Sequence, residues 1–177
     1  MNIKIILLTL LEKICKLIGK DSMKYKLTKY RIYGAKIGKN VRAFSPISSA
    51  ESYLLKVGDN VTISTGVRFI THDNSVIKIY DNATDIVGEI VIGNNVFIGA
   101  NTILLPGVNI ADNCVIGAGS VICKSINVPG TIVAGNPAKS IGCVENMKKK
   151  YLNNIFDFRY CDKKIEIMSH PERWIKK

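Results

Sequence analysis

The sequence predicts an all-β protein: a parallel β-helix of six-residue repeats with short α-helices at both ends. Over residues 91–142, an aliphatic or small residue recurs every six positions. That period fits neither an α-helix nor an alternating strand, and it is typical of hexapeptide coils. Residues 35–142 also leave no room for the helices that connect parallel strands in an ordinary α/β sheet. The recurring positions are Ile92, Ile98, Leu104, Ile110, Ile116, Ile122, Val128 and Ala134.

Three segments are expected within the 177 residues, a length that suits one domain with a core of its own. They are a basic, amphipathic helical segment over 1–34, the coils over 35–143, and a C-terminal helix with a basic tail over 144–177. The repeat breaks at about residues 73–89, which predicts a loop inserted between coils. Such long loops are usually either functional or disordered.

The N-terminal segment begins with an apolar stripe interrupted by charges over residues 3–18, which predicts an amphipathic helix. It is too short and too charged to span a bilayer, and it lacks the cleavage site of a signal peptide. Two interpretations stay open. The helix caps the coil stack or packs on a neighbouring chain, or it lies on a membrane surface with lysines on its polar face. A second short helix is expected over 22–34, and an amphipathic helix over 144–158.

The formal net charge is +11, and the excess of Lys and Arg lies in the two terminal segments. The positive charge alone would allow nucleic-acid binding. Because no known nucleic-acid-binding module accompanies the charge, we expect no nucleic-acid partner. The five cysteines are odd in number and form no Cys-x-x-Cys pair. We therefore expect no structural disulfides and a reducing, cytoplasmic location, with possible contact at the inner face of the cell membrane through residues 3–18.

Histidine is the side chain best suited to act as a base near neutral pH, and the chain has two, His72 and His170. His72 lies where the repeat gives way to the inserted loop, and Asp73 follows it as a candidate to orient the imidazole. The alternative is that both are ordinary loop residues. A catalytic zinc site needs three protein ligands, which two distant histidines do not supply, so no metal is predicted.

The stretches PGVNIADNCVIGAGSVICKSI and VAGNPAKSI resemble the hexapeptide-repeat acyltransferase superfamily. Maltose/galactoside-type and capsule-type O-acetyltransferases look most similar, and the resemblance covers roughly residues 35–142. It implies a left-handed coil, a homotrimer, and acetyl-CoA lying in the groove between adjacent prisms. It also implies that His72 is the catalytic base.

The same resemblance suggests residues for the cofactor and the acceptor. Ala100 and Ala118 align with positions whose backbone touches the pantetheine arm. Cys123 and Lys124 align with a Thr-Lys pair near the adenine, although Cys123 departs from the usual Thr and has no hydroxyl group to offer. Lys139 aligns with a basic residue that faces a CoA phosphate. Polar contacts at the mouth of the site are expected from two further residues, Asn74 and Asn101.

We therefore predict an acetyl-CoA-dependent O-acetyltransferase that modifies a sugar hydroxyl, in capsule, O-antigen or similar surface-polysaccharide synthesis. One alternative is an N-acetyltransferase acting on a nucleotide-linked amino sugar, which would use the same base. A non-catalytic hexapeptide scaffold is an alternative of another class. A serine acetyltransferase is disfavoured, because such enzymes carry a large helical N-terminal domain. The sequence leaves the acceptor open.

Overall fold

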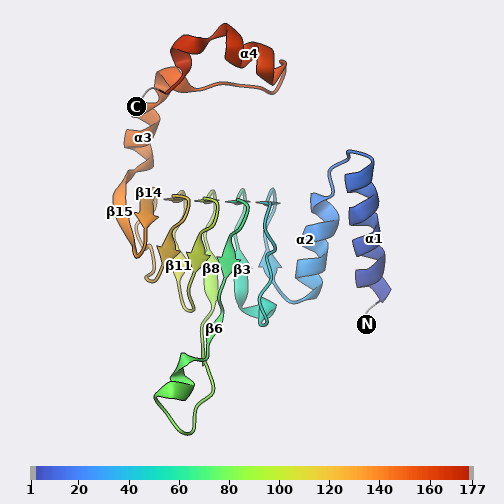
Figure 1. Cartoon of the computed structure of the whole chain (residues 1–177), viewed down its shortest axis with the longest axis vertical. Helices are drawn as coiled ribbons and strands as arrows, with labels where there is room; N and C mark the ends of the chain where they lie inside the picture. Colours follow the sequence, from blue (N-terminus) through green and yellow to red (C-terminus); the bar gives the residue numbers. More distant parts are fainter. Residues whose placement is uncertain (1–2, 176–177) are drawn as a thin grey trace.

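The computed structural model describes residues 3–175 as a stack of coils with helices at both ends and one protruding hairpin (Figure 1). Three sheets, which we call faces A, B and C, run along the stack. Face A contains β1 (Lys36–Ile37), β3 (Leu55–Val57), β8 (Ile90–Ile92) and β11 (Asn109–Ile110). Face B contains β2 (Arg42–Ala43), β4 (Thr62–Ile63), β9 (Phe97–Ile98), β12 (Val115–Ile116) and β14 (Thr131–Gly135). Face C contains β5 (Arg68–Phe69), β10 (Ile103–Leu104) and β13 (Val121–Ile122).

The strands of each face pair in parallel between neighbouring coils, with one exception: β15 (Ala138–Cys143) turns back and pairs antiparallel with β14. From Ile92 to Ile122 the pairing repeats every eighteen residues, so three hexapeptides make one coil. The recurring aliphatic side chains point inward and are at most 2% exposed. The predicted inward position is confirmed for Ile92, Ile98, Leu104, Ile110, Ile116 and Ile122.

The prediction is wrong for the last two positions. Val128 is 68% exposed and Ala134 is only half-buried. Ile126 bridges Ile110 instead, and Val133 pairs with Ile116. The last coil is therefore shorter than the others, because Ile126 follows Ile122 by four residues, whereas Ile110 follows Leu104 by six.

Asparagines shape the edge between faces A and B. Asn40, Asn60, Asn95 and Asn113 all have φ between +53° and +60°, the left-handed region that Asn tolerates better than most residues. Their amides also bond from coil to coil, as from Asn95 Nδ2 to Asn113 Oδ1 at 2.8 Å. The asparagine side chains on this edge therefore hold neighbouring coils together.

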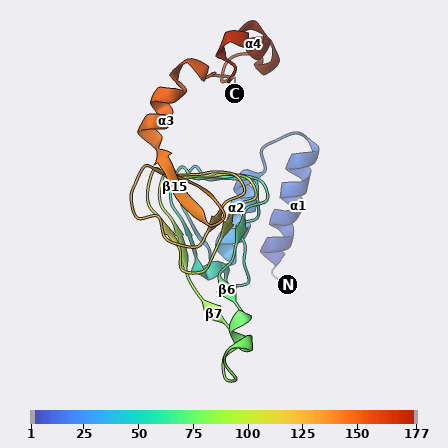
Figure 2. The same cartoon turned by 60° about the vertical axis from the view of Figure 1, so that its left-hand side comes forward.

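The inserted loop forms a hairpin that projects from the stack (Figures 1 and 2). Its base is the antiparallel pair β6 (His72–Asp73) and β7 (Ile86–Val87), and its tip contains the short 3-10 helix η2 (Ser75–Lys78). Because of this insertion, Val57 and Ile92 are thirty-five residues apart although they are neighbours on face A. A smaller irregularity, η1 (Ser52–Leu54), precedes β3.

Helices α1 (Ile3–Leu17) and α2 (Met23–Ile32) lie beyond the first coil, and α2 is nearer to the coils (Figure 1). At the other end, α3 (Val144–Lys150) and α4 (Lys163–Ser169) form an arm that leaves the last coil and curves back above the stack (Figures 1 and 2). The helix expected over 144–158 is shorter than predicted, because the chain passes into η3 (Leu152–Asn154) and is extended by Ile155. A last 3-10 turn, η4 (Pro171–Arg173), follows α4. Within residues 3–175, no helix combines the length and the apolar content that a bilayer crossing requires.

Candidate active site

The candidate site lies on the edge of the prism between faces C and A. Phe69, Leu104 and Ile122 pair in register in successive coils. The residues that follow each strand, 70–72, 105–107 and 123–125, therefore lie one above another, about 4.8 Å apart per coil. We call this the His72 edge. It is also where the hairpin leaves the stack.

His72 is held by a carboxylate from the first coil. Its Nδ1 lies 2.9 Å from Oε2 of Glu51, the residue before η1. Because a carboxylate only accepts hydrogen bonds, this contact fixes the proton on Nδ1. Nε2 of the neutral ring is then the nitrogen free to take a proton. The His72 side chain is 41% exposed, so a substrate can reach it.

Glu51 is itself held by hydroxyl groups. Thr71 Oγ1 donates to the same Oε2 at 2.6 Å, and Ser49 Oγ bonds to Thr71 Oγ1. Thr71 is buried at 1% exposure. The resulting chain Ser49–Thr71–Glu51–His72 runs from the interior of the coils to the surface and limits the rotation of the imidazole.

These contacts shift the pKa of both partners in the direction that keeps them charged. The hydrogen bond from His72 to Glu51, followed by the charge of Glu51, raises the pKa of His72 above its ordinary value, and burial is a smaller, opposing cause. The hydrogen bond from Thr71, followed by that from His72, lowers the pKa of Glu51. The pair is therefore arranged to stabilise a protonated imidazole, which is what a general base becomes when it removes a proton.

Asp73 does not make the contact that the sequence suggested. Its Oδ1 accepts a hydrogen bond from the backbone N–H of Ser75 at 2.8 Å, which lowers its own pKa. Glu51 bonds to His72 Nδ1 in its place. Asn74 is exposed at the start of η2, and its side chain makes no capping bond there.

The base of the hairpin is fitted closely against the next coil. Val87 pairs with His72, and the N–H of Gly88 donates to Thr71 O at 2.9 Å. A Cβ on Gly88 would stand 2.3 Å from the backbone nitrogen of Gly107. The position of His72 therefore depends on a close backbone approach that only glycine permits.

Two of the residues predicted for the cofactor lie on the His72 edge. Cys123 and Lys124 line a depression of about 370 Å³ below β13, together with Ser125, Ile126, Ala138 and Ser140 among others. Thr71, Pro106 and Lys124 occupy equivalent places after their strands. Lys124 therefore lies two coils, or roughly 10 Å, from Thr71 along the His72 edge. Lys139 is exposed between Ala138 and Ser140 and does not line this depression.

The remaining predicted residues lie on a different edge, between faces B and C. There the N–H of Gly119 donates to Ala100 O at 2.7 Å, and Ala118 follows in the next coil. Asn101 has φ +59°, and its N–H donates to Thr65 O at 2.9 Å. Face C separates this edge from the His72 edge by about five residues, or ~17 Å of strand. One chain therefore does not bring Ala100, Ala118 or Asn101 to the side of His72.

Sequence reasoning missed Glu51, Thr71 and Ser49. A signal was nevertheless present, because the first two coils are twenty residues apart, as the pairs Ile37–Val57 and Ala43–Ile63 show. Subtracting twenty from Thr71 gives Glu51, one coil away on the same edge. Among residues 3–175, no three His, Cys, Asp or Glu side chains gather closely enough to hold a metal ion.

Comparison with known proteins identifies the family. The family model described as bacterial transferase hexapeptide (six repeats) matches residues 89–124. Protein CapG of Staphylococcus aureus is 42% identical over 150 residues, covering 80% of this chain and 86% of CapG. The chain belongs to the hexapeptide-repeat acyltransferases. Galactoside O-acetyltransferase of Escherichia coli (strain K12) is 36% identical over 125 residues, which cover 69% of this chain and 61% of that protein.

Solved structures of this acyltransferase family share its architecture. A maltose O-acetyltransferase from Clostridium difficile 630 has a TM-score of 0.54 at 26% identity, covering 78% of this chain and 88% of its own. An acetyltransferase from Vibrio cholerae O1 biovar eltor, solved with acetyl coenzyme A, has a TM-score of 0.51 at 28% identity over 63% of this chain and 61% of its own. A galactoside acetyltransferase in complex with coenzyme A, at 24% identity, shows the same fold with a TM-score of 0.56, covering 90% of this chain and 88% of its own.

Proposed function

We propose that this acyltransferase uses acetyl-CoA to acetylate a sugar hydroxyl during the synthesis of a surface polysaccharide. The observation that carries the proposal is the His72–Glu51 pair at the base of the hairpin, with Nδ1 engaged and the His72 side chain 41% exposed. The relatives support the acyl donor and the acceptor class, since they include a maltose and a galactoside O-acetyltransferase and an enzyme solved with acetyl coenzyme A. The 42% identity to CapG supports a role connected with capsule.

The mechanism follows from the geometry of His72. Nε2 takes the proton of the acceptor hydroxyl while that oxygen attacks the thioester carbonyl. Glu51 stabilises the imidazolium that forms, as an acidic partner does in other histidine-based sites. The C–S bond then breaks, the CoA thiolate leaves, and the proton on Nε2 passes to it. A backbone N–H at a coil corner is expected to stabilise the oxyanion.

We assign the catalytic work to the coils over 35–143, with 1–34 and 144–177 as flanking segments. Lys124 on the His72 edge and Lys139 on β15 are proposed to attract CoA phosphates. Ala100 and Ala118 lie on an edge of the prism that does not contain His72. We therefore infer that the complete site forms between two copies of the chain, with Ala100 and Ala118 of one copy facing His72 of the other. This supports the homotrimer that the resemblance implies, and we propose with it a left-handed coil and a cytoplasmic location.

The test is thiol release from acetyl-CoA with a panel of sugars, nucleotide-linked amino sugars and polysaccharide repeat units. We expect turnover with a hydroxyl acceptor, and a loss of at least 100-fold in His72→Ala, the lower range for a general base. His170→Ala is the matched control, because His170 lies in the C-terminal arm, where it contacts Glu166 and Glu172. Equal turnover by His72→Ala and wild type would refute the proposed base. Turnover only with amine acceptors would show that the acceptor group is an amine and not a sugar hydroxyl.

A further inference from the structure

Helix α1 has its apolar side facing outward. Six aliphatic residues on it are between 44% and 87% exposed: Ile3, Ile6, Leu7, Leu10, Ile14 and Leu17. At 100° per residue they fall within an arc of about 100°. We call these six residues the α1 stripe. Contiguous exposed apolar surface of this kind marks a site of interaction.

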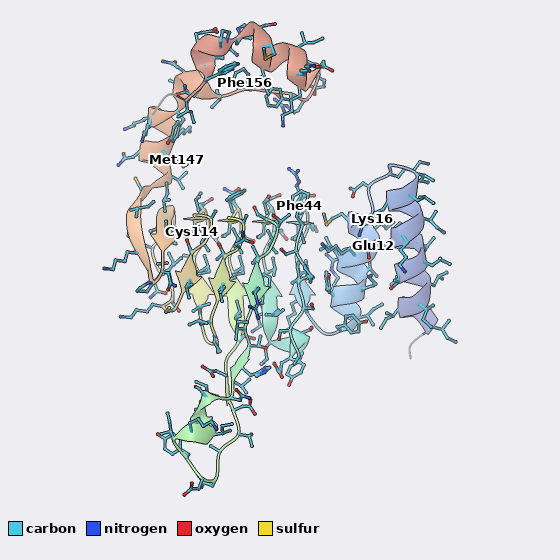
Figure 3. The ribbon with its side chains drawn as sticks, in the orientation of Figure 1. Glu12, Lys16, Phe44, Cys114, Met147 and Phe156 are labelled. Carbon is cyan, nitrogen blue, oxygen red and sulfur yellow. The ribbon has the colours of Figure 1, made fainter. Side chains whose placement is uncertain are left out.

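The opposite side of α1, which faces α2, combines partly buried apolar side chains such as Ile5 and Leu8 with a buried ion pair. Glu12 is only 8% exposed, and it pairs with Lys16 and with Lys29 of α2, both at 2.6 Å (Figure 3). Lys29 also bonds to Thr9 Oγ1 at 3.4 Å. Burying an ion pair is no more stabilising than burying apolar side chains in the same place. The contact with α2 thus leaves the six residues of the α1 stripe exposed on the outer side, and the stripe calls for an apolar partner.

Charge identifies that partner. Residues 3–42 contain eleven Lys and Arg against two acids, Glu12 and Asp21. Glu12 is neutralised by its two lysines, and Asp21 accepts a hydrogen bond from the N–H of Met23. The surface around the α1 stripe is thus strongly positive. A second copy of the stripe would bring the same positive charge and be repelled, whereas an anionic lipid surface offers both an apolar interior and the opposite charge.

We propose that the α1 stripe docks this enzyme on a bilayer that carries anionic phospholipids. Helix α1 is about 22 Å long at 1.5 Å per residue, shorter than the ~30 Å hydrocarbon core, so it lies in the plane of the interface. Because α2 separates α1 from the first coil (Figures 1 and 2), the coil stack stands end-on with its last coil distal. His72, in the second coil, is then on the side nearer to the membrane.

The test is flotation of the full-length protein with phosphatidylcholine vesicles that do or do not contain phosphatidylglycerol. We expect binding to the anionic vesicles, weakened by added salt, and at least a tenfold loss of binding in Leu7→Gln/Leu10→Gln. The matched control is Ile165→Gln/Met168→Gln, which changes two exposed apolar residues with the same spacing on α4. Circular dichroism checks that both variants stay folded.

Three results would overturn the proposal. The first is failure of the wild type to bind phosphatidylglycerol vesicles. The second is an equal loss of binding in the α1 and α4 variants. The third is a wild type that does not bind vesicles, together with a Leu7→Gln/Leu10→Gln variant that forms smaller assemblies than the wild type. That result would assign the α1 stripe to a second copy of the chain. None of these readouts depends on acetyl transfer.

Discussion

Gly88→Ala is the substitution that most sharply tests how the hairpin base positions His72. The new Cβ would lie 2.3 Å from Gly107 N, 2.8 Å from Gly107 Cα and 2.8 Å from Pro106 C, all backbone atoms. Since real Cβ contacts stay above 3.0 Å, the hairpin base must move by more than half an ångström. Overpacking of this kind costs about 1–3 kcal/mol. Val87, the preceding residue, pairs with His72, so the movement reaches the imidazole.

A displacement approaching 1 Å can cost ~100-fold in rate, so we expect kcat/KM in the thiol-release assay to fall about 10- to 100-fold. Tm should drop by about 2–4 °C per kcal/mol lost. The control is Gly19→Ala in the turn after α1, where φ is +69° and no atom lies within 4 Å of the new Cβ. It should cost about 1–2 kcal/mol for the left-handed backbone and leave kcat/KM unchanged. If Gly88→Ala kept wild-type activity and Tm, the close approach to Gly107 would not position the site.

Two further predictions concern the core and the cofactor. Leu104→Ala, at a fully buried position between Phe69 and Ile122, should cost about 2–5 kcal/mol, measured by chemical denaturation. Val128→Ala, at an exposed position, should stay within about 0.5 kcal/mol, and comparable losses would contradict the shortened last coil. Lys124→Ala should raise the KM for acetyl-CoA several-fold, and more steeply at low salt because phosphate pairing is screened. An unchanged KM would remove Lys124 from the site.

The coil stack could be predicted because the sequence repeats its physical constraint in every coil. Each inward position from Ile92 to Ile122 meets the same packing above and below, so one six-residue period describes them all. Val128 escapes this rule because nothing in the period signals where the stack ends. The short step from Ile122 to Ile126 and the return of β15 decide it, and the pairings that define both join residues distant in sequence.

Only part of the site could be predicted from the sequence, because its contacts also join residues from different coils. His72 could be located from the break in the repeat, but its partner depends on the register between coils. Asp73 is adjacent in sequence, yet its carboxylate bonds to Ser75 N. Glu51, twenty-one residues earlier, reaches Nδ1 because the first coil is two residues longer than those from Ile92 onward. Likewise, motif alignment groups Ala100 and Asn101 with His72, whereas the prism places them on separate edges.

The central claim is that His72, held by Glu51, is the base for acetyl transfer. The most direct test is the pH dependence of kcat/KM in wild type and Glu51→Gln, since kcat/KM reports the pKa of the free enzyme. The hydrogen bond and charge of Glu51 raise the pKa of His72, and a base acts only when deprotonated. In wild type, activity should therefore be lost on the acid side with a midpoint above ~6.5, the ordinary value for histidine. In Glu51→Gln the midpoint should move to lower pH and the plateau should fall, because the imidazolium loses its stabilising charge. An acid limb that stays in place in Glu51→Gln, or one that persists in His72→Ala, would contradict the account.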